Sequence, residues 1–226
     1  MKSIRALFLV LSLCVPSLAV SQESGSATVD NCLRVYMWFI GDTSSSMSGV
    51  RDSLCNFSER VGSLLDGLGE VQVGVMTFND SVYVWTEPVT HMPTVSRALD
   101  HSICMDSTAS YTGSTDMASA LHVAIRYTSN HILQDSSTWN VVVIYSDWQV
   151  NSNTRTTRAI HRLLDQGVIV CMVNPYAKPL MIPPEYIDPR YLSYTFSERD
   201  SLHFFRNSFM SLVQLLQELL PKILCG

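Results

Sequence analysis

The residues best suited to chemistry are an acid and two hydroxyls that follow an apolar run. Asp42, Ser44 and Ser46 occupy alternate positions directly after Val35–Ile40. One carboxylate and two hydroxyls that converge suit a hard cation such as Mg²⁺, which takes oxygen ligands. Asp and Ser are also preferred helix N-caps, so a serine-rich capping turn is the alternative interpretation.

The residues on both sides of this turn indicate a strand that leads into a helix. Val35–Ile40 is continuously apolar, which is typical of a central parallel strand covered on both faces. Apolar residues at helical spacing follow the turn: Val50, Leu54, Phe57, Val61 and Leu64. Because ligands of open α/β sheets bind at the carboxyl ends of strands, the turn lies at a binding edge.

The remaining pattern alternates strands with helices and predicts an α/β fold in a single domain. Val71–Phe78 and Val82–Trp85 form a hairpin, so the third strand is antiparallel and at an edge. Three later strands are expected at residues 139–145, 168–173 and 191–196, and helices at residues 93–99, 115–125, 156–164 and 205–220. We therefore expect a doubly wound, mostly parallel six-stranded sheet with one antiparallel edge strand and helices on both faces.

The N-terminus and the charge indicate the compartment. Residues 1–21 have a basic start, a short apolar core and small residues before a cleavage point after Ser21, with a point after Ala19 as the alternative, as in a secretory signal peptide. Residues 22–31 form a flexible leader and residues 32–226 the domain, which we expect to be secreted and extracellular. Loss of Lys2 and Arg5 changes the formal net charge from -5 to -7, which argues against nucleic acid as a partner.

Five cysteines follow the signal, and an oxidising compartment favours at least one disulfide among them. Cys55 and Cys104 are a candidate pair, whereas Cys171 lies in a buried strand and is expected to be a free, unreactive thiol. Two glycosylation sequons are present. The one at Asn79 falls on a turn where a glycan fits, and the one at Asn56 falls on a helix.

Two further loops carry oxygen-bearing side chains at the same edge of the predicted sheet. Thr115 stands at the start of a helix, and Asp147 directly follows the most apolar strand. The ordered set DTSSS at 42–46, GSTDMASAL at 113–121 and VVVIYSD at 141–147 resembles the von Willebrand factor type A domain. The resemblance covers essentially the whole mature chain in the same order of elements.

The resemblance implies a metal-ion-dependent adhesion site. Ser44, Ser46 and Thr115 would supply hydroxyl oxygens to Mg²⁺ or Mn²⁺, and Asp42 and Asp147 would supply charge directly or through water. Hydroxyl ligands leave such an ion under-neutralised. In the family, an Asp or Glu of the partner completes the site, so the expected partner is an extracellular protein that presents a carboxylate.

The chain departs from the family pattern after the last acid. That position is usually small in the family, and here it is Trp148. Two interpretations are open: the ring shapes the ligand surface beside the metal, or it folds back onto the edge of the sheet.

Other classes of protein find less support in the sequence. Six histidines are present, but none lies beside the Asp42–Ser46 turn, and no G-x-S-x-G motif marks a hydrolase. No lysine is positioned for an aspartyl-phosphate enzyme, and a phosphate-binding GK[ST] motif is absent. A decayed site that binds through a metal-independent surface remains the alternative, although all five ligand positions are intact. We therefore expect a binding module and not an enzyme.

The resemblance also predicts a disulfide between Cys32 and Cys225, because some secreted members close their adjacent termini in this way. The loop spans nearly the whole domain, so the bond would stabilise the fold by up to about 4 to 5 kcal/mol in the chain-entropy model. Non-reducing peptide mapping is expected to recover a Cys32–Cys225 cross-linked peptide. Recovery of Cys32 as a free thiol, or linked to another cysteine, would reject this pairing.

Overall fold

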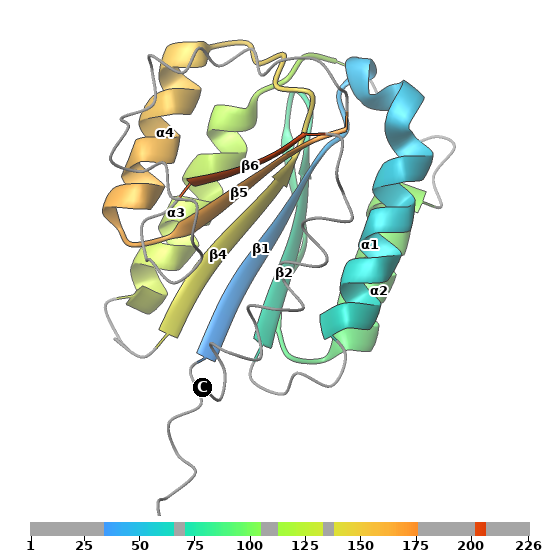
Figure 1. Cartoon of the computed structure of the whole chain (residues 1–226), viewed down its shortest axis with the longest axis vertical. Coiled ribbons are helices and arrows are strands. Elements are labelled where there is room, and N and C mark those ends of the chain that lie inside the picture. The colour runs from blue at the N-terminus through green and yellow to red at the C-terminus, as the bar shows by residue number, and fades with distance from the viewer. Residues whose placement is uncertain (1–33, 66–70, 105–112, 133–137, 176–201, 207–226) are drawn as a thin grey trace, which may run out of the picture. The chain divides into compact units, whose positions relative to one another are not determined.

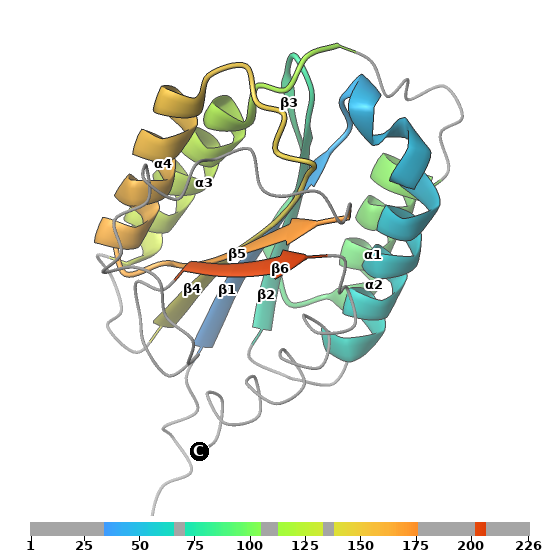
Figure 2. The ribbon, with the colours of Figure 1, turned by 45° about the horizontal axis from the view of Figure 1, so that its top comes forward.

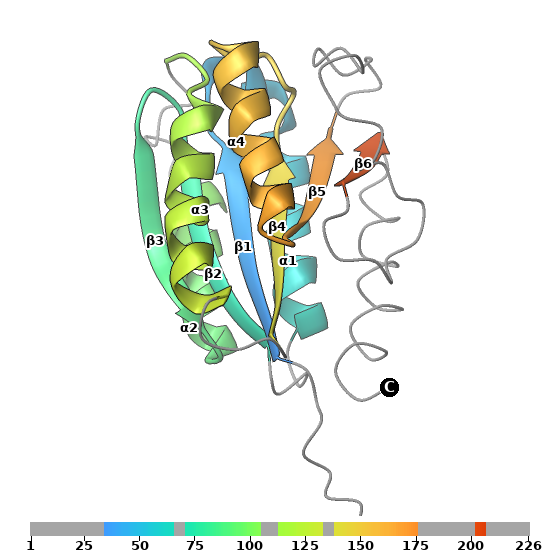
Figure 3. The same ribbon diagram turned by 90° about the vertical axis from the view of Figure 1, so that its left-hand side faces the viewer.

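The structure is a computed structural model that describes residues 34–65, 71–104, 113–132, 138–175 and 202–206. The described strands form one sheet in the order β3-β2-β1-β4-β5-β6, with β3 at one edge and β6 at the other (Figure 3). Their bounds are β1 Arg34–Asp42, β2 Val71–Phe78, β3 Val82–Val89, β4 Thr138–Tyr145, β5 Ile169–Asn174 and β6 Leu202–Arg206. Only β3 runs antiparallel to its neighbour, so the predicted α/β fold with a mixed sheet is confirmed.

Helices cover both faces of the sheet, as Figure 2 shows. On one side lie α1 (Arg51–Leu65) and α2 (Met92–Leu99), and on the other lie α3 (Met117–Ile132) and α4 (Asn153–Asp165). Two short turns of helix, η1 (Ser45–Val50) and η2 (Asp100–Cys104), flank α1 and α2 in the chain. Among the described residues no helix is long and apolar enough to cross a membrane.

The central strand β1 supplies side chains to both layers. Val35, Met37 and Phe39 belong to the core beneath α1 and α2, whereas Trp38 and Ile40 belong to the core beneath α3 and α4. Successive side chains of a strand point to opposite faces, so a strand covered on both sides has no polar face. The unbroken apolar run in the sequence is the direct consequence.

The predicted elements are confirmed up to β5, although β3 extends to Val89 and α3 to Ile132, beyond the predicted ends at residues 85 and 125. The C-terminal prediction was wrong in part. The strand expected at residues 191–196 and most of the closing helix lie outside the described residues. Phe205, which was assigned to that helix, instead lies in β6, which pairs in parallel with β5 through Val173↔Phe205. Phe205 and Phe209 have helical spacing, but Leu-His-Phe-Phe-Arg is also rich in β-formers, and short apolar runs do not separate the two.

The disulfide between Cys55 and Cys104 is present and joins α1 to η2. The Arg51 side chain, one turn before Cys55 on α1, strengthens this link. It donates from Nε to the Ile103 carbonyl at 3.3 Å and from Nη2 to the Cys104 carbonyl at 2.7 Å. The candidate pairing is therefore confirmed, while Cys32 and Cys225 lie outside the described residues.

Cys171 is the free cysteine of the described residues, and it is buried in β5 as predicted. Burial raises the pKa of its thiol to about 12. Because the thiolate is the reactive form, Cys171 should resist iodoacetamide at pH 8 in the folded protein and react after unfolding in guanidinium. Mass spectrometry of the Cys171 peptide measures both extents, and equal labelling in the two states would contradict the buried assignment.

Candidate metal centre

The strand order brings two of the predicted acids to one edge of the sheet. β1 and β4 are parallel neighbours, and their register pairs Gly41 with Tyr145, one residue before Asp42 and two before Asp147. The arrowheads of β1 and β4 point toward the same edge in Figure 1. Asp42 is 0% exposed and Asp147 is 5% exposed, so two carboxylates are buried where these strands end.

The loop that follows β1, which carries Thr43 to Ser46 and is here called the first loop, directs alternate side chains to different partners. Thr43 turns to the neighbouring strand, where its amide and its hydroxyl both donate to the Phe78 carbonyl, at 2.8 and 3.1 Å. Ser45 donates its hydroxyl to the Gly113 carbonyl at 3.2 Å. The hydroxyls of Ser44 and Ser46, in contrast, lie 3.3 Å from each other. The odd-numbered residues therefore tie the loop to its surroundings, and the two remaining hydroxyls are neighbours.

The Asp42 carboxylate links the first loop to the loop that follows β4, here called the third loop, which carries Ser146 and Asp147. Its Oδ1 accepts the Ser44 amide at 2.9 Å, and its Oδ2 accepts the Ser146 hydroxyl at 2.5 Å. Burial raises the pKa of Asp42 to about 6, although the hydrogen bonds from Ser146 and Ser44 lower it and the charge of Asp147 raises it further. The fold thus holds two acids near each other in a site that is shielded from solvent, where a cation would stabilise their negative charges.

Asp147 has an oxygen that the protein leaves unsatisfied. Its Oδ1 accepts the Gln149 amide at 3.1 Å, but its Oδ2 is buried and has no hydrogen-bond partner among the described residues. An unpaired buried carboxylate oxygen is costly, and metal coordination is one way to satisfy it. The donor set therefore fits a hard divalent cation: two carboxylates, from Asp42 and Asp147, and hydroxyls from Ser44, Ser46 and Thr115.

Thr115, the last predicted ligand, is 4% exposed and precedes α3. Its amide donates to Asn151 Oδ1 at 3.2 Å, and its carbonyl accepts the Asn151 amide at 3.0 Å. Sequence reasoning missed Asn151 and Ser146. Their role comes from contacts with residues 36 and 104 positions away in the chain, which no local pattern shows.

Trp148 is not a ligand-surface residue, and that interpretation was wrong. Its side chain is 0% exposed and packs in the core with Ile40, Ala120 and Ile160. The backbone at Trp148 has φ 64°, in the left-handed region that residues with a side chain rarely adopt. In this conformation the ring is buried against the helices. Burial of its large aromatic surface away from water is favourable. The second interpretation, a ring folded back onto the sheet, is confirmed.

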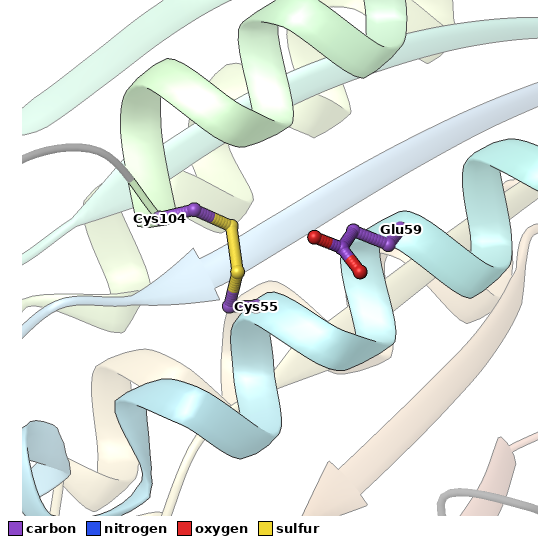
Figure 4. A group of neighbouring side chains, drawn as sticks. All are labelled: Cys55, Glu59 and Cys104. Carbon is purple, nitrogen blue, oxygen red and sulfur yellow. A yellow bond between two sulfur atoms is a disulfide. The ribbon is translucent and has the colours of Figure 1, made fainter.

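A second group of potential ligands lies between α1 and η2, as Figure 4 shows. The ligand atoms of Cys55, Glu59 and Cys104 lie within 4.8 Å of one another. The two sulfurs are bonded to each other, however, and only a thiolate binds zinc. The oxidised group is therefore a covalent brace between two helical segments and not a metal site.

The fold and the site together define an α/β domain whose polar loops meet where the parallel strands end. Residues 37–149 match the von Willebrand factor type A domain, which covers half of the 226-residue chain and includes all five predicted ligands. The chain therefore belongs to the von Willebrand factor type A domain family. No curated protein sequence matches the chain.

Several solved structures share the fold at low sequence identity. BatB from Bacteroides thetaiotaomicron is 12% identical with a TM-score of 0.59, over 83% of this chain and 99% of that one. The manganese-loaded Plasmodium vivax TRAP protein is 12% identical with a TM-score of 0.59, over 83% and 74%. Proximal thread matrix protein 1 from the mussel byssus, with a zinc-occupied MIDAS motif, is 17% identical with a TM-score of 0.55, over 85% and 46%.

The buried acid pair predicts that the site weakens the metal-free fold. The raised pKa of Asp42 means that its ionisation at pH 7 costs more in the folded chain than in the unfolded chain. In EDTA, Asp42→Asn should therefore raise the free energy of unfolding, by about 1 to 3 kcal/mol. Urea unfolding of the two proteins measures this difference. Asp52→Asn, at an exposed acid in the first turn of α1, should not raise stability, and a less stable Asp42→Asn protein would contradict the prediction.

Proposed function

We propose that this chain is a secreted adhesion module that binds a protein partner through a divalent cation, Mg²⁺ or Mn²⁺. The observation that carries the proposal is the buried Oδ2 of Asp147, which has no partner among the described residues and lies in a loop that is hydrogen-bonded to Asp42. In this proposal Asp42 and Asp147 supply the charge, and Ser44, Ser46 and Thr115 supply neutral oxygens.

The donor set itself selects the kind of partner. Two carboxylates and three hydroxyls leave a hard divalent cation without a full set of strong ligands, so water or an outside oxygen has to complete it. A partner Asp or Glu adds a third negative charge in a partly dry contact, where charge attraction is stronger than in bulk water. The proposed partner is therefore an extracellular protein that presents an acidic side chain.

The contacts of the histidines support a binding function over catalysis. Among the described residues, His91 contacts Thr94, His122 contacts the Ala118 carbonyl, and the His101 ring contacts Trp85 edge to face. None of these three contacts reaches a hydroxyl of the first loop, as a nucleophile and its general base would require. We therefore propose that the protein is not an enzyme.

The N-terminal sequence and two glycosylation sequons support the proposal that the protein is secreted. Residues 1–21 are proposed to be a signal peptide that is cleaved before the protein acts. Asn79 lies in the turn between β2 and β3, next to exposed Asp80 and Ser81, and we propose that it carries a glycan. Asn56 is also exposed, but it lies within the regular helix α1 and is the weaker candidate.

One observation favours a second candidate function, which is binding through a metal-independent surface. Three large hydrophobic residues of edge strand β3 are exposed: Tyr83 by 49% and Trp85 by 39% on one face of the strand, and Val84 by 42% on the other. Exposed apolar groups of this kind mark interaction surfaces in some proteins. This alternative predicts binding that does not respond to EDTA.

The test begins with a partner captured from secreted and surface proteins with Mg²⁺ present. Surface plasmon resonance then compares the parent protein and Asp147→Ala, in Mg²⁺ and in EDTA. Both the chelator and the substitution should abolish binding, because each removes the ion or a charge that holds it. Circular dichroism should show an intact fold, since Asp147 lies in a loop beyond β4.

A matched control variant separates the two candidate functions. Tyr83→Ser changes the β3 surface at its most exposed side chain and leaves all five proposed ligands in place, so it should bind like the parent protein. Binding that persists in EDTA and in Asp147→Ala, but is lost in Tyr83→Ser, would reject the metal site and favour the β3 surface.

A further inference from the structure

We propose that Asn151 and Asp80 are positioning residues that hold Thr115 where the metal requires its hydroxyl. The inference rests on the proposed function, because it concerns the same metal. Neither residue is among the five proposed ligands. Both contact the short segment of residues 113–116 that leads into α3.

Asn151 holds the backbone of Thr115 from two sides. Its side-chain Oδ1 accepts the Thr115 amide at 3.2 Å, and its own amide donates to the Thr115 carbonyl at 3.0 Å. Its Nδ2 also donates to the Ser114 hydroxyl at 2.9 Å. One residue therefore fixes both peptide groups that flank the Thr115 side chain, so the direction in which that side chain leaves the backbone is fixed as well.

Asp80 holds the preceding residue from the turn between β2 and β3. Its Oδ1 accepts both the amide of Ser114, at 2.6 Å, and the Ser114 hydroxyl. These two bonds lower the pKa of Asp80. Gly113 makes the approach possible, because a Cβ at that position would lie 2.0 Å from Asp80 Oδ2 and its backbone has φ +81°. The chain at Gly113–Ser114 is thus shaped around this carboxylate.

These contacts complete a set of links among the three loops that carry the proposed ligands. The first loop follows β1, the second comprises residues 113–116 before α3, and the third follows β4. Ser146 joins the third loop to Asp42 of the first, and Ser45 joins the first loop to the Gly113 carbonyl of the second. Asn151, four residues after Asp147, joins the second loop to the third. Each pair of loops is therefore connected by a side chain that is not itself a proposed ligand.

Such links set the geometry of a metal site more than they set the stability of the fold. Asp80 and Asn151 are exposed, so removing either side chain exposes little apolar core. Their hydrogen bonds instead limit how far Thr115 moves relative to Asp147. Loss of groups that orient metal ligands typically weakens metal affinity about 10- to 100-fold.

The experiment titrates the full mature chain with Mn²⁺ and measures free Mn²⁺ by electron paramagnetic resonance. Asn151→Ala and Asp80→Ala should each weaken Mn²⁺ binding about 10- to 100-fold, with little change in the melting temperature in EDTA. Asp80→Asn keeps an oxygen acceptor for the Ser114 amide and should recover part of the affinity. Asn153→Ala and Asp52→Asn, at exposed positions of α4 and α1, should bind like the parent protein and control for loss of an amide or a charge.

Amide hydrogen exchange of Thr115 provides a readout that needs no metal. In EDTA the Thr115 amide should exchange several-fold faster in Asn151→Ala than in the parent protein or in Asn153→Ala. A parent protein that binds no Mn²⁺ would reject the proposed function, and the Thr115 exchange rates would still decide the positioning proposal. Parent-like Mn²⁺ affinity in both alanine variants, or parent-like Thr115 exchange in Asn151→Ala, would overturn it.

Discussion

The hydrogen bond from the Ser146 hydroxyl to Asp42 Oδ2 is the contact on which the proposed metal centre depends, because it joins the end of β1 to the loop after β4. It keeps one buried carboxylate partly satisfied and brings the loop of a second carboxylate beside it. Burial of the ionised Asp42 carboxylate is unfavourable for a fold without a cation, as the raised pKa of Asp42 shows. The arrangement of the proposed centre therefore lowers the stability of the metal-free fold, which is common at functional sites.

The rest of the molecule supports this arrangement by packing against β1 on both faces and by linking α1 to η2. β1 lies between β2 and β4 and supplies side chains to both cores, so its end has little freedom to move. The disulfide of Cys55 and Cys104, together with Arg51, ties the start of α1 to η2. Segments on either side of the first and second loops are thus anchored, and the loops carry the polar groups on a fixed scaffold.

Much of the fold and most of the candidate site could be predicted from the sequence, because both rest on strong local signals. The apolar run of β1 and the helical spacing after it have one consistent solution, and strand order then places the loops at a common edge. The prediction was wrong where the local sequence pattern is compatible with more than one structure. Phe205 fits a strand as well as a helix, and the left-handed backbone of Trp148, whose ring is buried, is not marked by any local pattern.

The sequence by itself determined the residue types at the centre, the strands that carry them and the class of cation they suit, since these follow from side-chain chemistry and periodicity. Only the tertiary structure decided which groups hold those residues in place. Asn151, Asp80 and Ser146 act on residues 36, 34 and 104 positions away. Contacts at such distances arise when folding brings separate loops together, and no pattern within one segment specifies them.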